Sequence, residues 1–182
     1  MAVRFSVCQN RRMTQARHTG GPAGRIIIAR ATPDDAEEIL ALIRRAFAPA
    51  AEMYDAPDLP PLTETLEEHV ARYRTHAVLK ATDASGRIVG TVQGNLREDG
   101  TCYVARLAVE PAEQGHGVGR ELARALERLF PTARRFELFT GHRNEASLGL
   151  YASLGYREVR RERENERLTL VWLEKDVSDR PR

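Results

Sequence analysis

A strand-like run that turns through glycines into an amphipathic helix dominates the second half of this sequence. Residues 101–109 have strand character, and three glycines follow between positions 115 and 119. The next dozen residues place apolar side chains on one helical face, namely Val118, Leu122, Ala125, Leu126 and Leu129. A second strand-like run follows at 135–140. Because such strand–helix–strand crossovers are right-handed and parallel, we expect a cleft between two neighbouring or nearly neighbouring strands.

Turn and cap signals divide the rest of the chain into further elements. Thr32 and Pro33 are typical of a helix start, and prolines between 48 and 62 indicate a loop. The other predicted elements are a strand at 25–30, helices from 32 to about 47, 63–75 and 144–154, an antiparallel meander at 77–82, 87–96 and 101–109, and two strands within 156–177. We therefore expect an α+β fold, with a mixed, mostly antiparallel sheet of about seven strands and about four helices.

The length and charge distribution favour one domain. The chain has 182 residues, too few for two ordinary domains. Residues 1–24 carry four arginines and no acid, and we expect a disordered basic leader or a start at Met13 rather than the organellar transit peptide that they weakly resemble. The folded domain is expected at 25–177, with a short tail at 178–182. The domain itself has mixed charges, which disfavours nucleic acid as a partner.

Several other function classes are disfavoured by composition. No apolar stretch approaches the roughly 20 residues needed to cross a bilayer, so we expect no membrane partner. The two cysteines, Cys8 and Cys102, cannot build a disulfide framework, which fits a reducing compartment such as the cytoplasm. The five histidines show no metal-ligand spacing, so we expect no metal.

The segment Gln114–Arg120 has the properties of an anion-binding site. Amides at a helix start lack intrahelical partners and lie at the positive end of the helix dipole, and glycines let a phosphate approach the backbone. A simple tight turn is the alternative interpretation. A Walker loop would need Lys and then Ser or Thr, but Arg120 follows Gly119. The dinucleotide fingerprint also fails, because counting from Gly115 puts Arg120 at its sixth position.

Two motifs resemble those of the GNAT superfamily of N-acetyltransferases. Gln114, Gly117 and Gly119 match its acyl-CoA loop, and residues 107–111 look like the family strand that leads into that loop. A second family motif has an Asn, a Tyr two helical turns later, and a Gly followed by an aromatic residue. It is matched by Asn144, Tyr151, Gly155 and Tyr156. The resemblance covers roughly residues 25–175.

This resemblance implies an acetyl-CoA-dependent transfer to a primary amine. It implies that the parallel strands splay apart and that Tyr151 protonates the departing thiolate. Tyr151 as a core residue and Asn144 as a helix cap are the structural alternatives; Arg120 either contacts the pyrophosphate or belongs to the polar helix face. The expected cofactor contacts are Leu107, Ala108, Val109, Gln114, Gly115, His116, Gly117, Val118, Gly119, Arg120, Asn144 and Ser147.

The general base and the acceptor are left open by the sequence. Many relatives carry a strand glutamate where this chain has Tyr103 or Phe139. Without it, a non-catalytic acyl-CoA-binding or regulatory module is an alternative, as is a purely structural domain. The final hairpin is also compatible with a homodimer. The remaining candidate bases are Glu52, Tyr54, Glu64, His69, Glu98 and Glu110.

Overall fold

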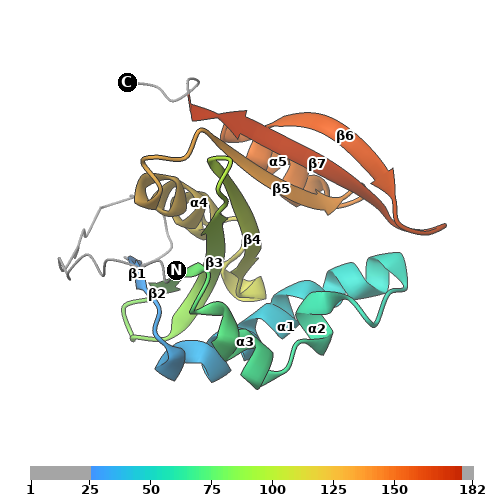
Figure 1. Ribbon diagram of the computed structural model, residues 1–182. Helices are drawn as coiled ribbons and strands as arrows, with labels where there is room; N and C mark the ends of the chain where they lie inside the picture. Colours follow the sequence, from blue (N-terminus) through green and yellow to red (C-terminus); the bar gives the residue numbers. More distant parts are fainter. Residues whose placement is uncertain (1–25, 178–182) are drawn as a thin grey trace, which may run out of the picture.

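The structure, a computed structural model, describes residues 26–177 of the chain. The expected leader at 1–24 and tail at 178–182 lie outside the described residues. Seven strands form one sheet in the order β1-β2-β3-β4-β5-β7-β6 (Figure 1). The strands are β1 Ile27–Arg30, β2 Ala77–Thr82, β3 Ile88–Leu96, β4 Thr101–Val109, β5 Arg135–Gly141, β6 Arg157–Arg163 and β7 Thr169–Asp176.

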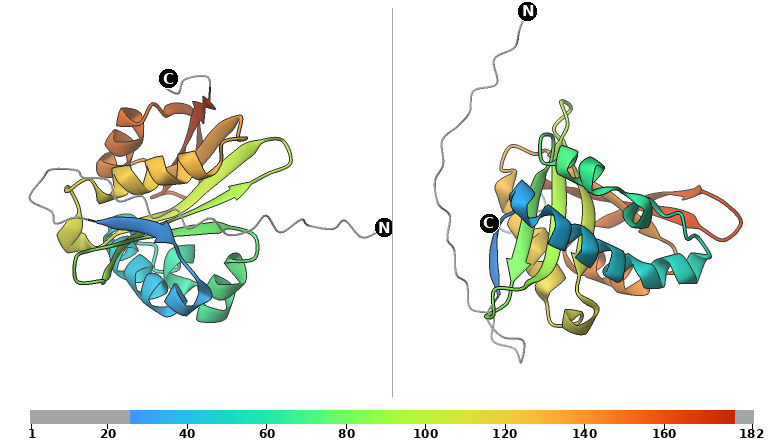
Figure 2. Two further views of the ribbon diagram at one scale, coloured as in Figure 1. Left: turned by 90° about the vertical axis from the view of Figure 1, so that its left-hand side faces the viewer. Right: turned by 90° about the horizontal axis from the view of Figure 1, so that it is seen from below.

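Helices cover both faces of this sheet (Figure 2). The helix α4 and the helix α5 pack on one face, where Leu122, Phe136 and Tyr151 belong to the largest apolar core. The helix α1 packs on the other face, where Ile39 and Val78 belong to a second core. The helices are α1 Ala36–Tyr54, α2 Pro60–Thr63, α3 Leu66–Arg72, α4 Val118–Leu129 and α5 Glu145–Ser153, with short 3₁₀ turns at Pro33–Asp35 and Pro111–Glu113.

The expected fold class is confirmed, including its parallel strand pair. Every neighbouring pair is antiparallel except β4 and β5, which are joined through α4 and lie directly side by side. The two strands expected within 156–177 are present as the antiparallel pair β6 and β7. No helix in the described part of the chain is long and apolar enough to cross a membrane.

The first helix is longer than the sequence predicted. We expected a loop from residue 48, but α1 continues through Pro49 to Tyr54 and ends at Asp55, which has a left-handed backbone with φ of 48°. Proline inside a helix removes one hydrogen bond, and its ring clashes with the carbonyl four residues earlier. The helix continues because Ala51 and Tyr54 are both buried beyond that point, and this burial outweighs the lost bond.

The prediction of a single helix at 63–75 is wrong, because two separate helices occupy this region. The chain forms a short α2, where prolines at the first turn need no N–H partner, and a separate α3. Thr65 and Glu68 make a capping box that starts α3, with Glu68 N donating to Thr65 Oγ1 at 3.2 Å. We expected Leu66, Val70 and Tyr73 to point inward, but Leu66 is 43% exposed, while His69 is fully buried.

Strand β4 leaves its parallel neighbour after three residues. It pairs with β5 only over Thr101–Tyr103. Further along, β4 carries an extra residue relative to β3, and Arg106 takes a left-handed φ of 53° at this bulge. The predicted splay between the two parallel strands is therefore present, and the bulge lies on the splayed part of β4.

Candidate active site

The glycine turn before α4 is open to solvent. Gly117 is the N-cap of α4 with φ of 88°, and Gly115 has φ of 79°. A Cβ added at either position would meet no atom within 4 Å. No side chain caps α4 within the part of the chain that the structure describes. The first amides of this helix are thus accessible to an anion from outside, which fits a diphosphate group.

The turn is attached directly to the end of β4. The Gln114 side-chain amide donates to the Val109 carbonyl at 3.1 Å. A Cβ on Gly119 would lie 3.5 Å from Val109 Cγ2 and 3.4 Å from Leu150 Cδ2 of α5. Gly119 therefore allows β4, α4 and α5 to meet closely. Gln114 acts here as a brace for the turn, a role that sequence reasoning did not assign.

The backbone of β4 next to the turn has a free side toward β5. Ala108 and Val109 pair with β3 on one side, but the described part of β5 pairs with β4 no further than Tyr103. Strand edges of this kind offer unpaired N–H and C=O groups to an extended amide-containing ligand. Leu107 and Val109 are half-buried, whereas Ala108 is buried against the α1 side.

Asn144 and Tyr151 lie on α5, as the second motif predicted. Asn144 is the N-cap, its Oδ1 accepting from Ser147 N at 3.1 Å. Tyr151 is 6% exposed and packs edge-to-face on Tyr156, with ring centroids 5.3 Å apart. Burial raises the pKa of Tyr151 far above its usual value, and the Tyr103 phenol raises it further. The cap and core interpretations are thus both present in the structure.

The comparisons with known proteins agree with this geometry. A family model described as the acetyltransferase (GNAT) family matches residues 36–156. The chain belongs to the GNAT acetyltransferase family. The matched region includes the glycine turn, the splayed strands and Tyr151. No curated protein sequence matches the chain.

Solved structures share the GNAT fold at low sequence identity. An N-acetyltransferase from Staphylococcus aureus Mu50 is 18% identical with a TM-score of 0.69, covering 84% of this chain and 99% of its own. The ribosomal-protein-S18-alanine N-acetyltransferase from Escherichia coli is 18% identical with a TM-score of 0.70, covering 86% and 96%. PaiA N-acetyltransferase from Thermoplasma acidophilum, in complex with coenzyme A, is 15% identical with a TM-score of 0.67, covering 83% and 98%.

Two predicted cofactor residues of this GNAT chain lie at the rim of the turn. The His116 side chain is 42% exposed, and its Nδ1 lies 3.9 Å from Glu113 Oε2. Arg120 is half-buried in the first turn of α4. Gln114 and the glycines are thus brought together with the end of β4, whereas His116 points at a neighbouring acid.

No group of three or more His, Cys, Asp or Glu that could hold a metal occurs among residues 26–177.

Glu64 is the most buried carboxylate among the candidate bases. It is 5% exposed and forms ion pairs with Arg72 and with Arg106, the latter at 3.2 Å. Its Oε1 also lies 3.6 Å from Nδ1 of His69. Both oxygens of this carboxylate are therefore engaged by guanidinium groups, Oε1 by Arg72 and Oε2 by Arg106. Arg72 and Arg106 also line a surface hollow of about 420 Å³, a feature that the sequence did not reveal.

The other candidate bases either have a hydrogen-bond or ion-pair partner or are exposed on the surface. Glu110 is bound by Arg45 at 2.9 Å, and the Tyr54 hydroxyl accepts from Arg143 N at 2.8 Å. Glu52 and Glu98 are exposed. Sequence reasoning assigned no role to Trp172, which pairs across the sheet with Phe139 of β5.

Proposed function

We propose that this chain transfers the acetyl group of acetyl-CoA to a primary amine while both substrates are bound. The observation that carries the proposal is the open glycine turn, which Gln114 fastens to the free end of β4. An anion site and an unpaired strand edge thus lie side by side. Coenzyme A offers both a diphosphate and an arm with amide groups. The coenzyme A complex of the Thermoplasma relative supports the same choice of ligand.

Each predicted contact residue has a part in this proposal. The amides of the turn and of the first turn of α4 bind the diphosphate. The β4 edge pairs with the amides of the pantetheine arm, and Asn144 and Ser147 border the site from α5. The residues on the loop and the strand are Leu107, Ala108, Val109, Gln114, Gly115, His116, Gly117, Val118, Gly119 and Arg120.

In the proposed reaction, acetyl-CoA supplies an activated thioester. The amine nitrogen forms a bond to the acetyl carbon while the carbon–sulfur bond breaks. The amine loses a proton to solvent, and Tyr151 gives its phenol proton to the departing sulfur. Because burial raises its pKa, Tyr151 remains protonated at neutral pH until that step. The phenolate is then reprotonated from water.

The anion site can be tested with a matched pair of glycine variants. Gly117 and Gly86 have nearly the same φ, 88° and 87°, and both have open space at the Cβ position. Alanine at either site is strained by about 1–2 kcal/mol, so both variants should lose similar stability. Gly117→Ala alone should weaken coenzyme A binding about tenfold in calorimetry, because it distorts the turn. Equal affinity in the two variants would contradict the proposed anion site.

Turnover separates an enzyme from a binding module. A panel of primary amines, tested for thiol release from acetyl-CoA, should reveal at least one acceptor. Coenzyme A affinity without release on any amine would favour the non-catalytic acyl-CoA module instead. No measurable affinity for coenzyme A would overturn both functions.

A further inference from the structure

Three aromatic rings form a continuous surface on the sheet face that carries α1. They are Tyr103 of β4, Phe139 of β5 and Trp172 of β7, called the aromatic wall below. Phe139 and Trp172 are direct cross-strand partners with ring centroids 5.0 Å apart. Tyr103 lies 6.3 Å from Phe139 and 6.5 Å from Trp172. Each ring is therefore within stacking range of the other two.

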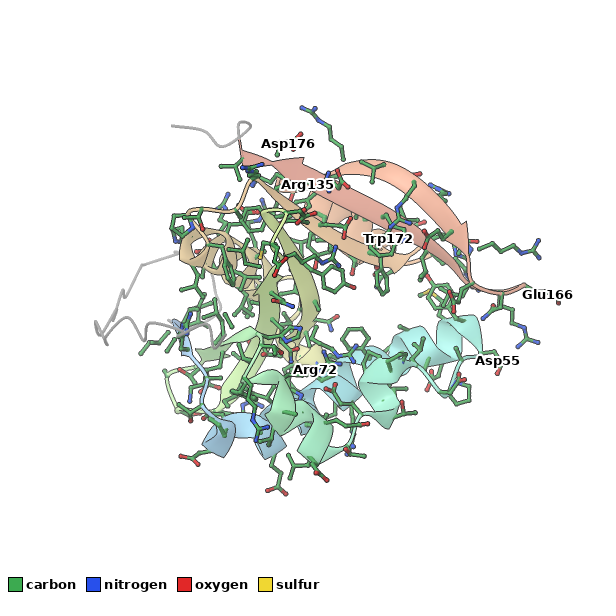
Figure 3. The ribbon with its side chains drawn as sticks, in the orientation of Figure 1. Asp55, Arg72, Arg135, Glu166, Trp172 and Asp176 are labelled. Carbon is green, nitrogen blue, oxygen red and sulfur yellow. The ribbon has the colours of Figure 1, made fainter. Side chains whose placement is uncertain are left out.

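The helix layer leaves this wall uncovered. Tyr54 at the end of α1 packs with Leu168, which precedes β7, and with Leu170 of β7 in a small apolar cluster that also includes Leu59. Trp172 points from β7 toward the side where α1 and α2 lie (Figure 3). Phe139 is nevertheless 42% exposed. A large ring exposed beside two half-buried ones is an apolar surface available to a ligand.

The wall begins where the parallel strands separate. Tyr103 is paired with Glu137, the last contact between β4 and β5, and Phe139 is two residues further along β5. Tyr103 also interacts electrostatically with Tyr151 on the opposite face of the sheet. A molecule lying on the wall would therefore have one end at the splay, near the proposed proton donor.

The polar groups around the wall are already paired with one another. The Arg160 guanidinium stacks 3.9 Å from the Trp172 ring centroid and pairs with Glu162, which also accepts from Trp172 Nε1 at 2.8 Å. Arg97 lies 5.0 Å from the Tyr103 ring centroid and bonds Glu137 at 2.9 Å. These contacts fix the rings in place. They also neutralise both acids, so a polycationic acceptor finds little attraction here.

We infer that the acceptor is an arylalkylamine, whose aromatic ring stacks on Tyr103, Phe139 and Trp172 while its amine reaches the splay between β4 and β5. This inference rests on the proposed acetyl transfer and names the substrate class of the same site. Aromatic rings favour offset or edge-to-face contact with other rings, which an alkyl chain of similar area does not reproduce. The wall thus distinguishes the acceptor by its ring and not by its charge.

Binding can be measured without turnover when coenzyme A, which carries no acetyl group, replaces acetyl-CoA. Trp172 is the single tryptophan of the chain, so its fluorescence reports directly on the aromatic wall. With coenzyme A present, 2-phenylethylamine should change the Trp172 emission in a saturable way. Butylamine, which carries the same amine without a ring, should produce a much smaller change at equal concentration. Equal responses to the two amines, or no response to the aromatic one, would overturn the inference.

Kinetics then separate this inference from the proposed function. Phe139→Ala should lower kcat/KM for 2-phenylethylamine about tenfold, mainly through KM, and leave butylamine acetylation within about twofold. Phe139→Leu keeps the apolar volume but should lose most of the same preference. Val159→Ala removes a 49% exposed apolar side chain elsewhere on the hairpin and serves as the control. Acetylation of both amines at equal efficiency by the native protein would refute the wall as the acceptor site but retain the acetyltransferase.

Discussion

At the scale of a single residue, Tyr151 has two features that bear on the proposed proton transfer. Burial raises its pKa, so the phenol is protonated at neutral pH, and the preceding residue, Leu150, lies against Gly119 of the glycine turn. The same burial gives it a packing role beside Tyr156. Removing the hydroxyl while keeping the ring separates these two roles.

Tyr151→Phe should lower kcat by about a hundredfold or more, because sulfur leaves without a proton donor. Coenzyme A affinity and the urea midpoint should stay close to native values, since the ring is retained. Steady-state thiol release and calorimetry measure these effects. Tyr73→Phe is a matched control. The Tyr73 hydroxyl is also buried and has no hydrogen-bond partner among the described residues, and Tyr73 packs against the core on the α1 side of the sheet. Equal kcat in both variants would show that Tyr151 is only a core residue.

At the scale of elements, a buried ion pair fastens the last strand to the helix of the glycine turn. Lys175 of β7 donates to Glu127 of α4 at 2.8 Å, and both side chains are less than 10% exposed. The Tyr156 ring lies 5.6 Å from the same ammonium group. The position of α4, and thus of the anion site, depends in part on this pair.

Lys175→Met should destabilise the fold by about 3–5 kcal/mol, because it removes the cation that pairs with the buried Glu127 carboxylate. Adding Glu127→Leu should recover most of the loss, since it also removes that carboxylate. Urea denaturation measures both changes. Arg124→Met breaks an exposed pair with Glu121 on the same helix, 3.4 Å long, and should cost less than about 1 kcal/mol. A Lys175→Met protein as stable as the Arg124→Met protein would contradict the importance of this pair.

At the scale of the whole molecule, one buried polar cluster joins the helix layer to the splayed strand. Glu64 links Arg72 at the end of α3 to Arg106 at the bulge of β4. His69 is fully buried beside Glu64, and its ring nitrogens have no hydrogen-bond partner among the described residues. The cluster therefore couples folding stability to the protonation of a histidine.

Burial lowers the pKa of His69, and the positive charges of Arg72 and Arg106 lower it further. The negative charge of Glu64 has the opposite effect but is weaker than burial. Below about pH 6.5 the unfolded chain gains a proton at this residue that the folded chain does not bind. The free energy of unfolding should thus fall between pH 7.5 and 5.5, by at most about 1.4 kcal/mol per pH unit for this group.

The pKa of His76 is lowered in the same way, so the two residues act together. Urea denaturation of His69→Gln across this pH range should show a smaller slope than the native protein. An unchanged slope would mean that His69 is not responsible for the acid sensitivity.

The sequence predicted a structural feature well where that feature depends on neighbouring residues along the chain, and poorly where it depends on packing against distant ones. The capping Asn144 and the turn glycines were recognisable because each acts on its own few neighbours. The bounds of β2 and β4 followed from alternation and turn residues. The end of α1 could not be predicted, because Pro49 locally favours a break, whereas Tyr54 is buried against Leu168 and Leu170, which are distant in sequence.

The sequence by itself determined the order of strands and helices, the glycine turn and the helix position of Tyr151, since these depend on spacing along the chain; the GNAT family followed from the resemblance of two motifs. Only the tertiary structure decided that Glu64 is neutralised by arginines and that Tyr103, Phe139 and Trp172 form one surface. Those residues lie far apart in sequence and meet through strand order and register. Side-chain contacts across a sheet depend on which strands pair and in what alignment, which no local pattern specifies.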